Sequence, residues 1–221
     1  VCALLYAGFN VWQAVRLARS LPAFWQAQAG RPTPAGTFRL LALGDSATQA
    51  VGAAQPLEGF VGRIAAHVQS VTGRPVHITN LSIGGATAGD ILQTQLPHAD
   101  PASADLVIVS SANDLEQRVS LAEYEEKLDA LLSLLPAQRT VLSDLPLEPG
   151  RAPYQAVLAR VAGWHGVRRA GFAGTFRPAR QLLIFSWLPP HLNSRGYDLW
   201  FQAFRPAVDD LLCRAAANRR P

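Results

Sequence analysis

The sequence predicts an α/β protein: a three-layer α/β/α, flavodoxin-like fold with a five-stranded parallel sheet. Short apolar runs that end in glycine or polar residues alternate along the chain with longer segments whose apolar residues recur at helical spacing. The chain has 221 residues, 49% of them hydrophobic and 16% charged, which is enough to bury one core. We therefore expect a single domain over residues 37–217.

Five apolar runs are the expected strands. The first, Phe38–Leu43, reads FRLLAL and stops at Gly44, as a strand buried on both faces does. The others are expected at 76–83, 106–109, 140–142 and 167–172, the last being the weakest.

Helical patterns separate these runs. Residues 59–71 carry one apolar face. Ser120 and Glu123 form a capping box before a helix that Pro136 stops. Further helices are expected at 88–96, at 153–163, and from a cap at Asn193 to about Ala216.

The first 36 residues are expected to lie outside the domain. Residues 1–21 predict an apolar helix, and residues 22–36, with three prolines and two glycines, predict a linker. Three alternatives are open for the helix: the tail of a truncated membrane anchor, which is favoured, an interfacial amphipathic helix, or a helix packed on the domain. The first two would make the protein membrane-associated through residues 1–19.

Composition argues against several classes of function. The net charge of +4 comes almost wholly from scattered arginines, and no cluster of arginine and aromatic residues suggests nucleic-acid binding. Cys2 and Cys213 lie at opposite ends of the chain, which gives neither a disulfide framework nor a metal-ligand pair. The histidines show no ligand spacing either, so no metal or organic cofactor is expected.

The loops after the expected strands carry groups that acyl transfer needs, because ligands bind beyond the carboxyl ends of parallel strands. Ser46 places a hydroxyl after the first strand, and the backbone N–H groups of Ser46 and Gly85 and the Asn113 amide could stabilise an oxyanion. His191 lies in a proline-rich loop before the last helix.

Four blocks in this order resemble the SGNH (GDSL) hydrolase superfamily: LALGDS at 41–46, NLSIGGAT at 80–87, SAND at 111–114 and HLNSRGY at 191–197. The resemblance runs from about Phe38 to Leu212. It implies Ser46 as nucleophile, His191 as general base, and an oxyanion hole formed by Ser46, Gly85 and Asn113. Asp45 and Asp114 are interpreted as supporting loop residues.

Two positions depart from the family pattern. Ser111 replaces the first glycine of the third block, and Leu188 stands three residues before His191, where the family has the acid of its triad. A backbone carbonyl can fix a histidine tautomer, so we expect a Ser46–His191 dyad oriented by a main-chain carbonyl such as that of Leu188. Asp198 lies a turn or more into the next helix and is not expected to act.

The leading functional hypothesis is a hydrolase that acts on small or lipid-like carboxylic esters through an acyl-enzyme. Two alternatives remain open: a catalytically degenerate SGNH-fold protein that binds an acyl or sugar ligand, and an O-acetylesterase or acyltransferase acting on envelope carbohydrate. Structural interpretations also remain: Ser46 as a helix N-cap, and His191 as a surface histidine. The run 187–190 (WLPP) is interpreted as an acyl-binding wall, an apolar lip near a membrane, or simple loop packing.

Overall fold

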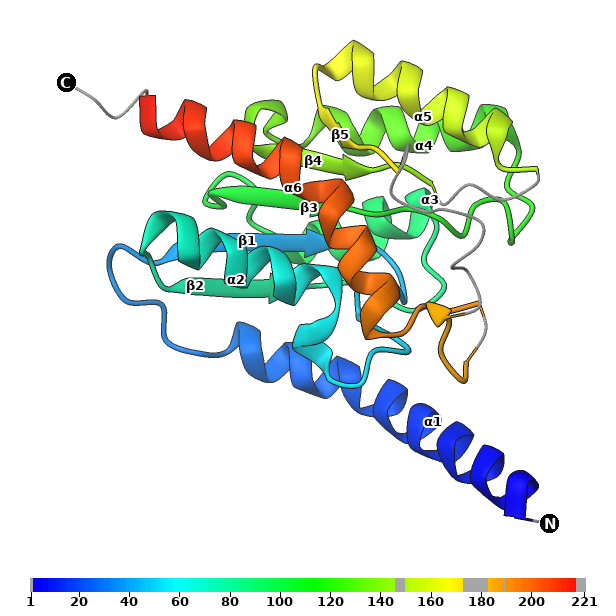
Figure 1. Ribbon diagram of the computed structural model, residues 1–221. Coiled ribbons are helices and arrows are strands. Elements are labelled where there is room, and N and C mark those ends of the chain that lie inside the picture. Colours follow the sequence, from blue (N-terminus) through cyan, green and yellow to red (C-terminus); the bar gives the residue numbers. More distant parts are fainter. Residues whose placement is uncertain (1, 146–149, 173–182, 189, 218–221) are drawn as a thin grey trace.

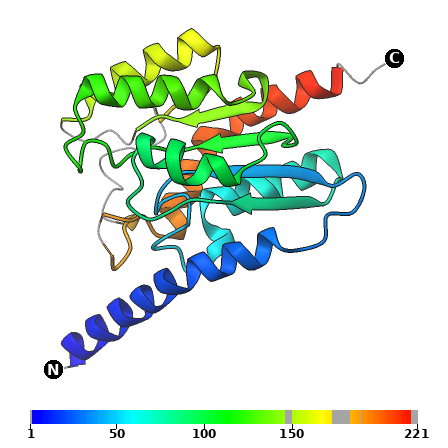
Figure 2. The same cartoon turned by 180° about the vertical axis from the view of Figure 1, so that it is seen from behind.

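The computed structural model describes residues 2–145, 150–172, 183–188 and 190–217. A parallel sheet lies between two layers of helices, which confirms the predicted fold class (Figures 1 and 2). Its five strands lie in the order β2-β1-β3-β4-β5, the doubly wound order: β2 is added on one side of β1, and β3 to β5 are added on the other. The strands are β1 (Phe38–Leu43), β2 (Val76–Asn80), β3 (Leu106–Val109), β4 (Thr140–Ser143) and β5 (Arg168–Ala170).

Two strands end earlier than the sequence predicts. β2 stops at Asn80 because the side-chain oxygen of Asn80 accepts the Ser82 N–H at 3.1 Å, which turns the chain out of the strand. β5 stops at Ala170 because it is an edge strand and its one neighbour, β4, ends at Ser143. Proline 189 and residues 146–149 and 173–182 lie outside the described residues.

Alternate residues of the strands face two separate cores, as a doubly covered sheet requires. Leu40, Ala42 and Ile108 pack with helices α2 (Phe60–Thr72) and α6 (Ser194–Ala217) on one face. On the other face, Leu41, Leu43 and Val109 pack with three helices, which are α3 (Ala88–Asp90), α4 (Leu121–Ser133) and α5 (Ala152–His165).

The predicted N-cap residues are present, and of the capping box expected at Ser120 and Glu123 the structure shows the bond to the Ser120 hydroxyl. The Ser120 hydroxyl accepts the Glu123 N–H at 3.2 Å, and Asn193 Oδ1 accepts the N–H groups of Arg195 and Gly196 at 2.9 and 3.1 Å. The segment expected as one helix at 88–96 is instead three short pieces: α3, a π-helical turn over Ile91–Gln95, and a 3₁₀ turn over Leu96–His98. Two further 3₁₀ turns span Pro56–Glu58 and Ala137–Arg139.

The predicted linker is wrong for residues 22–29, because helix α1 spans Cys2–Ala29 and contains Pro22. Proline removes one helical N–H and crowds the preceding turn. Burial of Leu21 and Trp25 against the domain offsets that cost, since both side chains are at most 2% exposed. Within the predicted linker, residues 30–36 are non-helical, as expected.

The two halves of α1 differ in their surroundings. The C-terminal half packs on the domain, whereas the N-terminal half extends beyond it, with Phe9, Val11 and Trp12 exposed (Figures 1 and 2). In the part of the chain that the structure describes, no helix is long and apolar enough to cross a membrane.

Candidate active site

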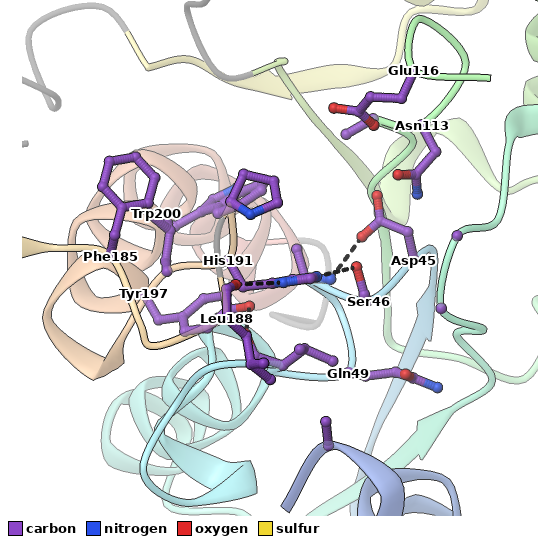
Figure 3. Close-up of a pocket in the computed structure, with 18 of the residues that line it drawn as sticks. Asp45, Ser46, Gln49, Asn113, Glu116, Phe185, Leu188, His191, Tyr197 and Trp200 are labelled. Carbon is purple, nitrogen blue, oxygen red and sulfur yellow. Dashed lines mark hydrogen bonds between the residues drawn. The ribbon is translucent and has the colours of Figure 1, made fainter. Parts of the chain in front are cut away.

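A cavity of about 710 Å³ opens where the carboxyl ends of the strands meet (Figure 3). Its walls come from the loops after β1, β2 and β3, from Arg151 before α5, from α6, and from residues 183–188 and 190–193, which we call the histidine loop. α1 also contributes one residue to the wall. The residues that line it include Ala18, Asp45, Ser46, Gln49, Val51, Gly85, Asn113, Glu116, Arg151, Ile184, Phe185, Leu188, His191, Leu192, Tyr197 and Trp200.

The sharp turn at Gly44 directs Ser46 into this cavity. A Cβ at Gly44 would lie 2.2 Å from Thr48 Oγ1 and 2.6 Å from the Ser110 carbonyl oxygen, so no other residue fits without displacing backbone. The buried Gln95 amide holds the same residue from both sides, accepting the Gly44 N–H at 2.8 Å and donating to its carbonyl at 2.7 Å.

Ser46 and His191 lie within hydrogen-bonding distance, with Ser46 Oγ 3.0 Å from His191 Nε2 (Figure 3). The other ring nitrogen, Nδ1, lies 2.9 Å from the Leu188 carbonyl oxygen. Because a carbonyl can only accept, Nδ1 carries the proton and Nε2 presents its lone pair to the Ser46 hydroxyl. The arrangement has the polarity of a nucleophile and its general base.

The turn that holds the Leu188 carbonyl is itself held by hydrogen bonds. That carbonyl also accepts the backbone N–H of His191 at 2.9 Å. Ser186 Oγ accepts the Leu188 N–H at 3.0 Å, and the Ser186 N–H donates to the His191 carbonyl at 2.9 Å. The orientation of the imidazole therefore depends on main-chain geometry rather than on an acidic side chain.

Asp198, the carboxylate next along the chain after His191, is directed elsewhere. It forms an ion pair with Arg63 at 3.0 Å. The Arg63 guanidinium also donates to the Ser194 carbonyl at 3.1 Å, which ties α2 to the start of α6. This agrees with the expectation that Asp198 does not act as the acid.

The candidate oxyanion donors Gly85 and Asn113 line the same cavity as Ser46, from two neighbouring loops. Gly85 has φ +81°, a conformation that favours glycine, and lines the cavity together with Asn113. One N–H of the Asn113 amide donates to the Ala86 carbonyl at 3.2 Å, which fixes the side chain between the two loops. An amide nitrogen carries two N–H groups, so a second donor remains on Asn113.

Ser111 and Asp114 form hydrogen bonds that join these two loops. Ser111 Oγ donates to Asp114 Oδ2 at 2.6 Å, and the Asp114 carboxylate accepts the Ala88 N–H at 3.1 Å. The serine in place of glycine therefore adds a hydrogen bond, and its backbone φ is not positive. Asp114 is buried and is not among the residues lining the cavity.

Asp45 is buried beside Ser46 (Figure 3). Burial raises the pKa of its carboxyl to about 6, although N–H groups of Ala47, Thr48 and Ala112 favour the charged form. The bond from the Ala47 N–H is 2.9 Å long and lies within the turn that carries Ser46. Asp45 thus accepts hydrogen bonds within this loop.

Several side chains at the site were not assigned from the sequence. Arg151 is buried at the cavity wall and donates to Glu116, and Gln49 Nε2 donates to the Ser82 carbonyl at 2.8 Å. Tyr197 Oη donates to the Val51 carbonyl at 2.7 Å, and Gly196-Tyr197 in the last sequence block was the one available signal. Among the residues that the structure describes, no group of three His, Cys, Asp or Glu side chains could hold a metal ion.

A serine–histidine pair in a cavity at the carboxyl edge of a parallel sheet is the arrangement found in serine-dependent acyl hydrolases of the α/β class. Residues 42–199 match the GDSL-like Lipase/Acylhydrolase family, and the chain belongs to that family. No curated protein matches the chain in sequence.

Solved structures share the fold at low sequence identity. An alpha/beta hydrolase enzyme from the metagenome of Lake Arreo, Spain, is 23% identical, covers 80% of this chain and 98% of its own, and has a TM-score of 0.63. The lipase/acylhydrolase from Enterococcus faecalis is 18% identical, with coverages of 80% and 97% and a TM-score of 0.62. An acetylxylan esterase from Geobacillus stearothermophilus is 21% identical, with coverages of 80% and 96% and a TM-score of 0.60.

Proposed function

We propose that this protein hydrolyses carboxylic esters through an acyl-enzyme on Ser46, with His191 as general base and the Leu188 carbonyl in place of the family's acid. The observation that carries the proposal is the pair of distances at His191: 3.0 Å from Nε2 to Ser46 Oγ, and 2.9 Å from Nδ1 to the Leu188 oxygen. The proton on Nδ1 leaves Nε2 free to accept the serine proton.

In the first half-reaction, Ser46 Oγ attacks the ester carbonyl carbon while its proton passes to His191 Nε2. The tetrahedral intermediate collapses, the bond to the alcohol oxygen breaks, and His191 returns the proton to the leaving alcohol. A water molecule then attacks the acyl-enzyme with His191 again as base, which releases the carboxylic acid and restores Ser46. No metal or organic cofactor takes part in these steps.

The negative charge of each tetrahedral intermediate develops on the former carbonyl oxygen. The N–H groups of Ser46 and Gly85 and the second N–H of the Asn113 amide are the donors proposed for it. In a site lined largely by apolar side chains such donors act in a low dielectric, where one of them lowers the activation barrier by roughly 3 kcal/mol.

The acyl group is proposed to lie against the apolar wall of the cavity. Val51, Ile184 and Leu192 form this wall with Tyr197 and Trp200, and all five are largely buried. The charged pair Arg151–Glu116 also lines the cavity. The apolar wall favours an acyl chain without charge.

Labelling and turnover test this proposal directly. Wild type should react with a fluorophosphonate probe and turn over p-nitrophenyl acetate, and Ser46→Ala and His191→Ala should lose activity about 10³-fold or more. Ser133→Ala and His98→Ala, which change exposed residues on other parts of the chain, are the matched controls. Equal residual activity in the wild type and the two site variants would contradict the proposal.

The same observation favours a catalytic protein over a degenerate one that only binds an acyl or sugar ligand. A degenerate site needs no hydrogen-bond acceptor on the second ring nitrogen of its histidine. Here the acceptor lies at 2.9 Å, and three further hydrogen bonds hold the turn that carries it.

A further inference from the structure

Five large apolar side chains are exposed on two segments that lie far apart in the sequence. Phe9 and Trp12 belong to α1, whereas Leu183, Phe185 and Trp187 belong to the histidine loop, and each is 40–64% exposed. The rings of Phe9 and Trp12 stack with centroids 6.1 Å apart. We call these five side chains, together with Arg16 and Arg195, the α1 face.

The two segments form one continuous surface. A groove of about 790 Å³ runs between them, and Trp12, Leu183, Phe185 and Trp187 all line it. Figures 1 and 2 show the histidine loop beside the middle of α1, and the α1 residues that line the groove lie between Asn10 and Ser20. Phe185 lines both this groove and the Ser46 cavity, so the α1 face adjoins the entrance to the candidate active site.

The packing of α1 leaves its outer side uncovered. Ala18, Leu21 and Trp25 lie on one side of the helix, and all three pack against the domain core. At 3.6 residues per turn, Trp12, Arg16 and Arg19 fall on the opposite side. Burying apolar surface against the domain therefore directs the aromatic and basic residues outward.

Charge on this surface has a single sign. The Arg16 guanidinium lies 5.5 Å from the Trp12 ring centroid, and Arg195 lines the same groove. The described residues that line the groove include no acidic side chain. The sequence contains no Asp or Glu before Asp45, so the only charges on α1 are Arg16 and Arg19.

We infer that the α1 face docks on the surface of a lipid bilayer that contains anionic lipids. Trp and Phe rings partition into the headgroup region of a bilayer, and arginines beside them attract anionic headgroups. Docking in this way places the shared residue Phe185, and with it the entrance to the Ser46 cavity, at the lipid surface. The inference names the source of substrate for the proposed function: an ester carried by the membrane.

Vesicle flotation tests the docking separately from catalysis, because it is carried out on Ser46→Ala protein. This protein should float with mixed phosphatidylcholine/phosphatidylglycerol vesicles and bind much less to phosphatidylcholine alone. Replacing Arg16 and Arg19 by Gln should lower partitioning onto the anionic vesicles roughly 30-fold. Replacing Trp12 and Trp187 by Ala should lower it about tenfold or more on both kinds of vesicle.

Matched controls exist on other helices. Trp164 on α5 is 60% exposed and has Arg160 over its ring at 5.7 Å, yet it lies away from α1, and Trp164→Ala should leave flotation unchanged. Arg205→Gln on α6 is the corresponding arginine control. Raising the salt concentration should weaken binding of the parent protein and of the Trp variant, since the Debye length falls from about 10 Å at 0.1 M to about 3 Å at 1 M.

The outcomes separate the two proposals. Failure to float, or equal flotation of the Trp12/Trp187 and Trp164 variants, overturns the docking inference. So does a wild-type dimer that the Trp12/Trp187 change dissociates, because a second copy then covers the α1 face. If wild-type protein turns over a soluble ester but does not float, the proposed function stands and the docking inference fails. If the protein floats but wild type turns over no ester, the proposed function fails and the docking inference stands.

Discussion

The Leu188 carbonyl accepts two hydrogen bonds from one residue, the backbone N–H and the ring Nδ1–H of His191. A carbonyl orients the imidazole as a carboxylate does, but it carries only a partial negative charge. In the proposed mechanism it would therefore stabilise the imidazolium of the transition state less than an aspartate would. Under that proposal, the Leu188 carbonyl would supply the orienting contribution of a triad acid and little of its electrostatic contribution.

Leu188→Asp should raise kcat/KM for p-nitrophenyl acetate about tenfold or more, because a carboxylate three residues before His191 adds a full charge beside Nδ1. Leu188→Asn is the matched control, since it offers an acceptor of similar size without the charge. Both variants lose the partial packing of Leu188 against the core, so their thermal unfolding is measured alongside. An Asp variant no more active than the Asn variant would contradict this account.

Gly44 gives a second prediction at the scale of one residue. Gly44→Ala should destabilise the protein by roughly 3 kcal/mol or more, because the added methyl would collide with backbone and with Thr48. Gly163→Ala, inside α5 with no atom within 4 Å of the added Cβ, should instead stabilise by about 0.5–1 kcal/mol. Denaturant unfolding of both variants measures the contrast, and equal effects would rule out the steric argument.

At the scale of elements, local patterns predict the parts of the fold that local chemistry decides. Periodic apolar residues and caps at Ser120 and Asn193 mark α4 and α6, and continuous apolar runs mark β1 and β3. The π-helical turn at 91–95 was not predictable, because no local pattern reveals that Gln95 bonds to Gly44, 51 residues earlier.

The linker error has the same cause. Three prolines and two glycines in residues 22–36 favour a coil locally, yet α1 continues to Ala29 because Leu21 and Trp25 are buried by distant parts of the chain. Sequence pattern does not report such tertiary packing. It also could not reveal that α1 contributes Ala18 to the wall of the Ser46 cavity.

Substitution of Trp25 tests how much α1 contributes to the stability of the domain and to the geometry of the candidate active site. Its Nε1–H donates to the Gln49 carbonyl at 3.0 Å, and Gln49 lies three residues after Ser46. Trp25→Ala should cost roughly 3–5 kcal/mol of unfolding free energy and also reduce ester turnover. Trp25→Phe should cost less, since it keeps most of the burial and loses the hydrogen bond, worth about 1 kcal/mol.

Trp164→Ala is again the control, because a 60% exposed tryptophan should change stability by no more than about 0.5 kcal/mol. If Trp25→Ala were as mild as Trp164→Ala, α1 would be an appendage rather than part of the domain. The three proteins are compared by urea unfolding and by turnover at saturating substrate.

For the whole molecule, the sheet decides which loops meet. The strand order places β1 between β2 and β3, so the loops that carry Ser46, Gly85 and Asn113 leave the same edge of the sheet next to one another. The ordered sequence blocks could predict this convergence, because every strand of a parallel sheet points the same way. The loops that follow the strands therefore all leave the same edge of the sheet. The apolar wall of the cavity was not predictable in this way, because Val51, Ile184 and Trp200 come from three segments with no common pattern.

The buried Asp45 carboxyl couples the site to the stability of the whole molecule. Its pKa rises to about 6 in the folded protein, against about 3.9 in an unfolded chain. Between these values the folded state binds more protons than the unfolded state, so this group's contribution to stability is complete below about pH 4 and is lost as the pH rises to about 6. The loss amounts to roughly 3 kcal/mol, and above pH 6 it stays constant.

Asp45→Asn removes the titration of this group. The free energy of unfolding of wild type minus that of the variant should therefore fall between about pH 4 and pH 6 and be flat above pH 6. Urea unfolding of both proteins from about pH 4 to 8 gives that difference directly. A difference that stays level from pH 4 to 6, or that rises, would show that Asp45 remains charged throughout and that its hydrogen bonds to the turn after β1 outweigh the cost of burial.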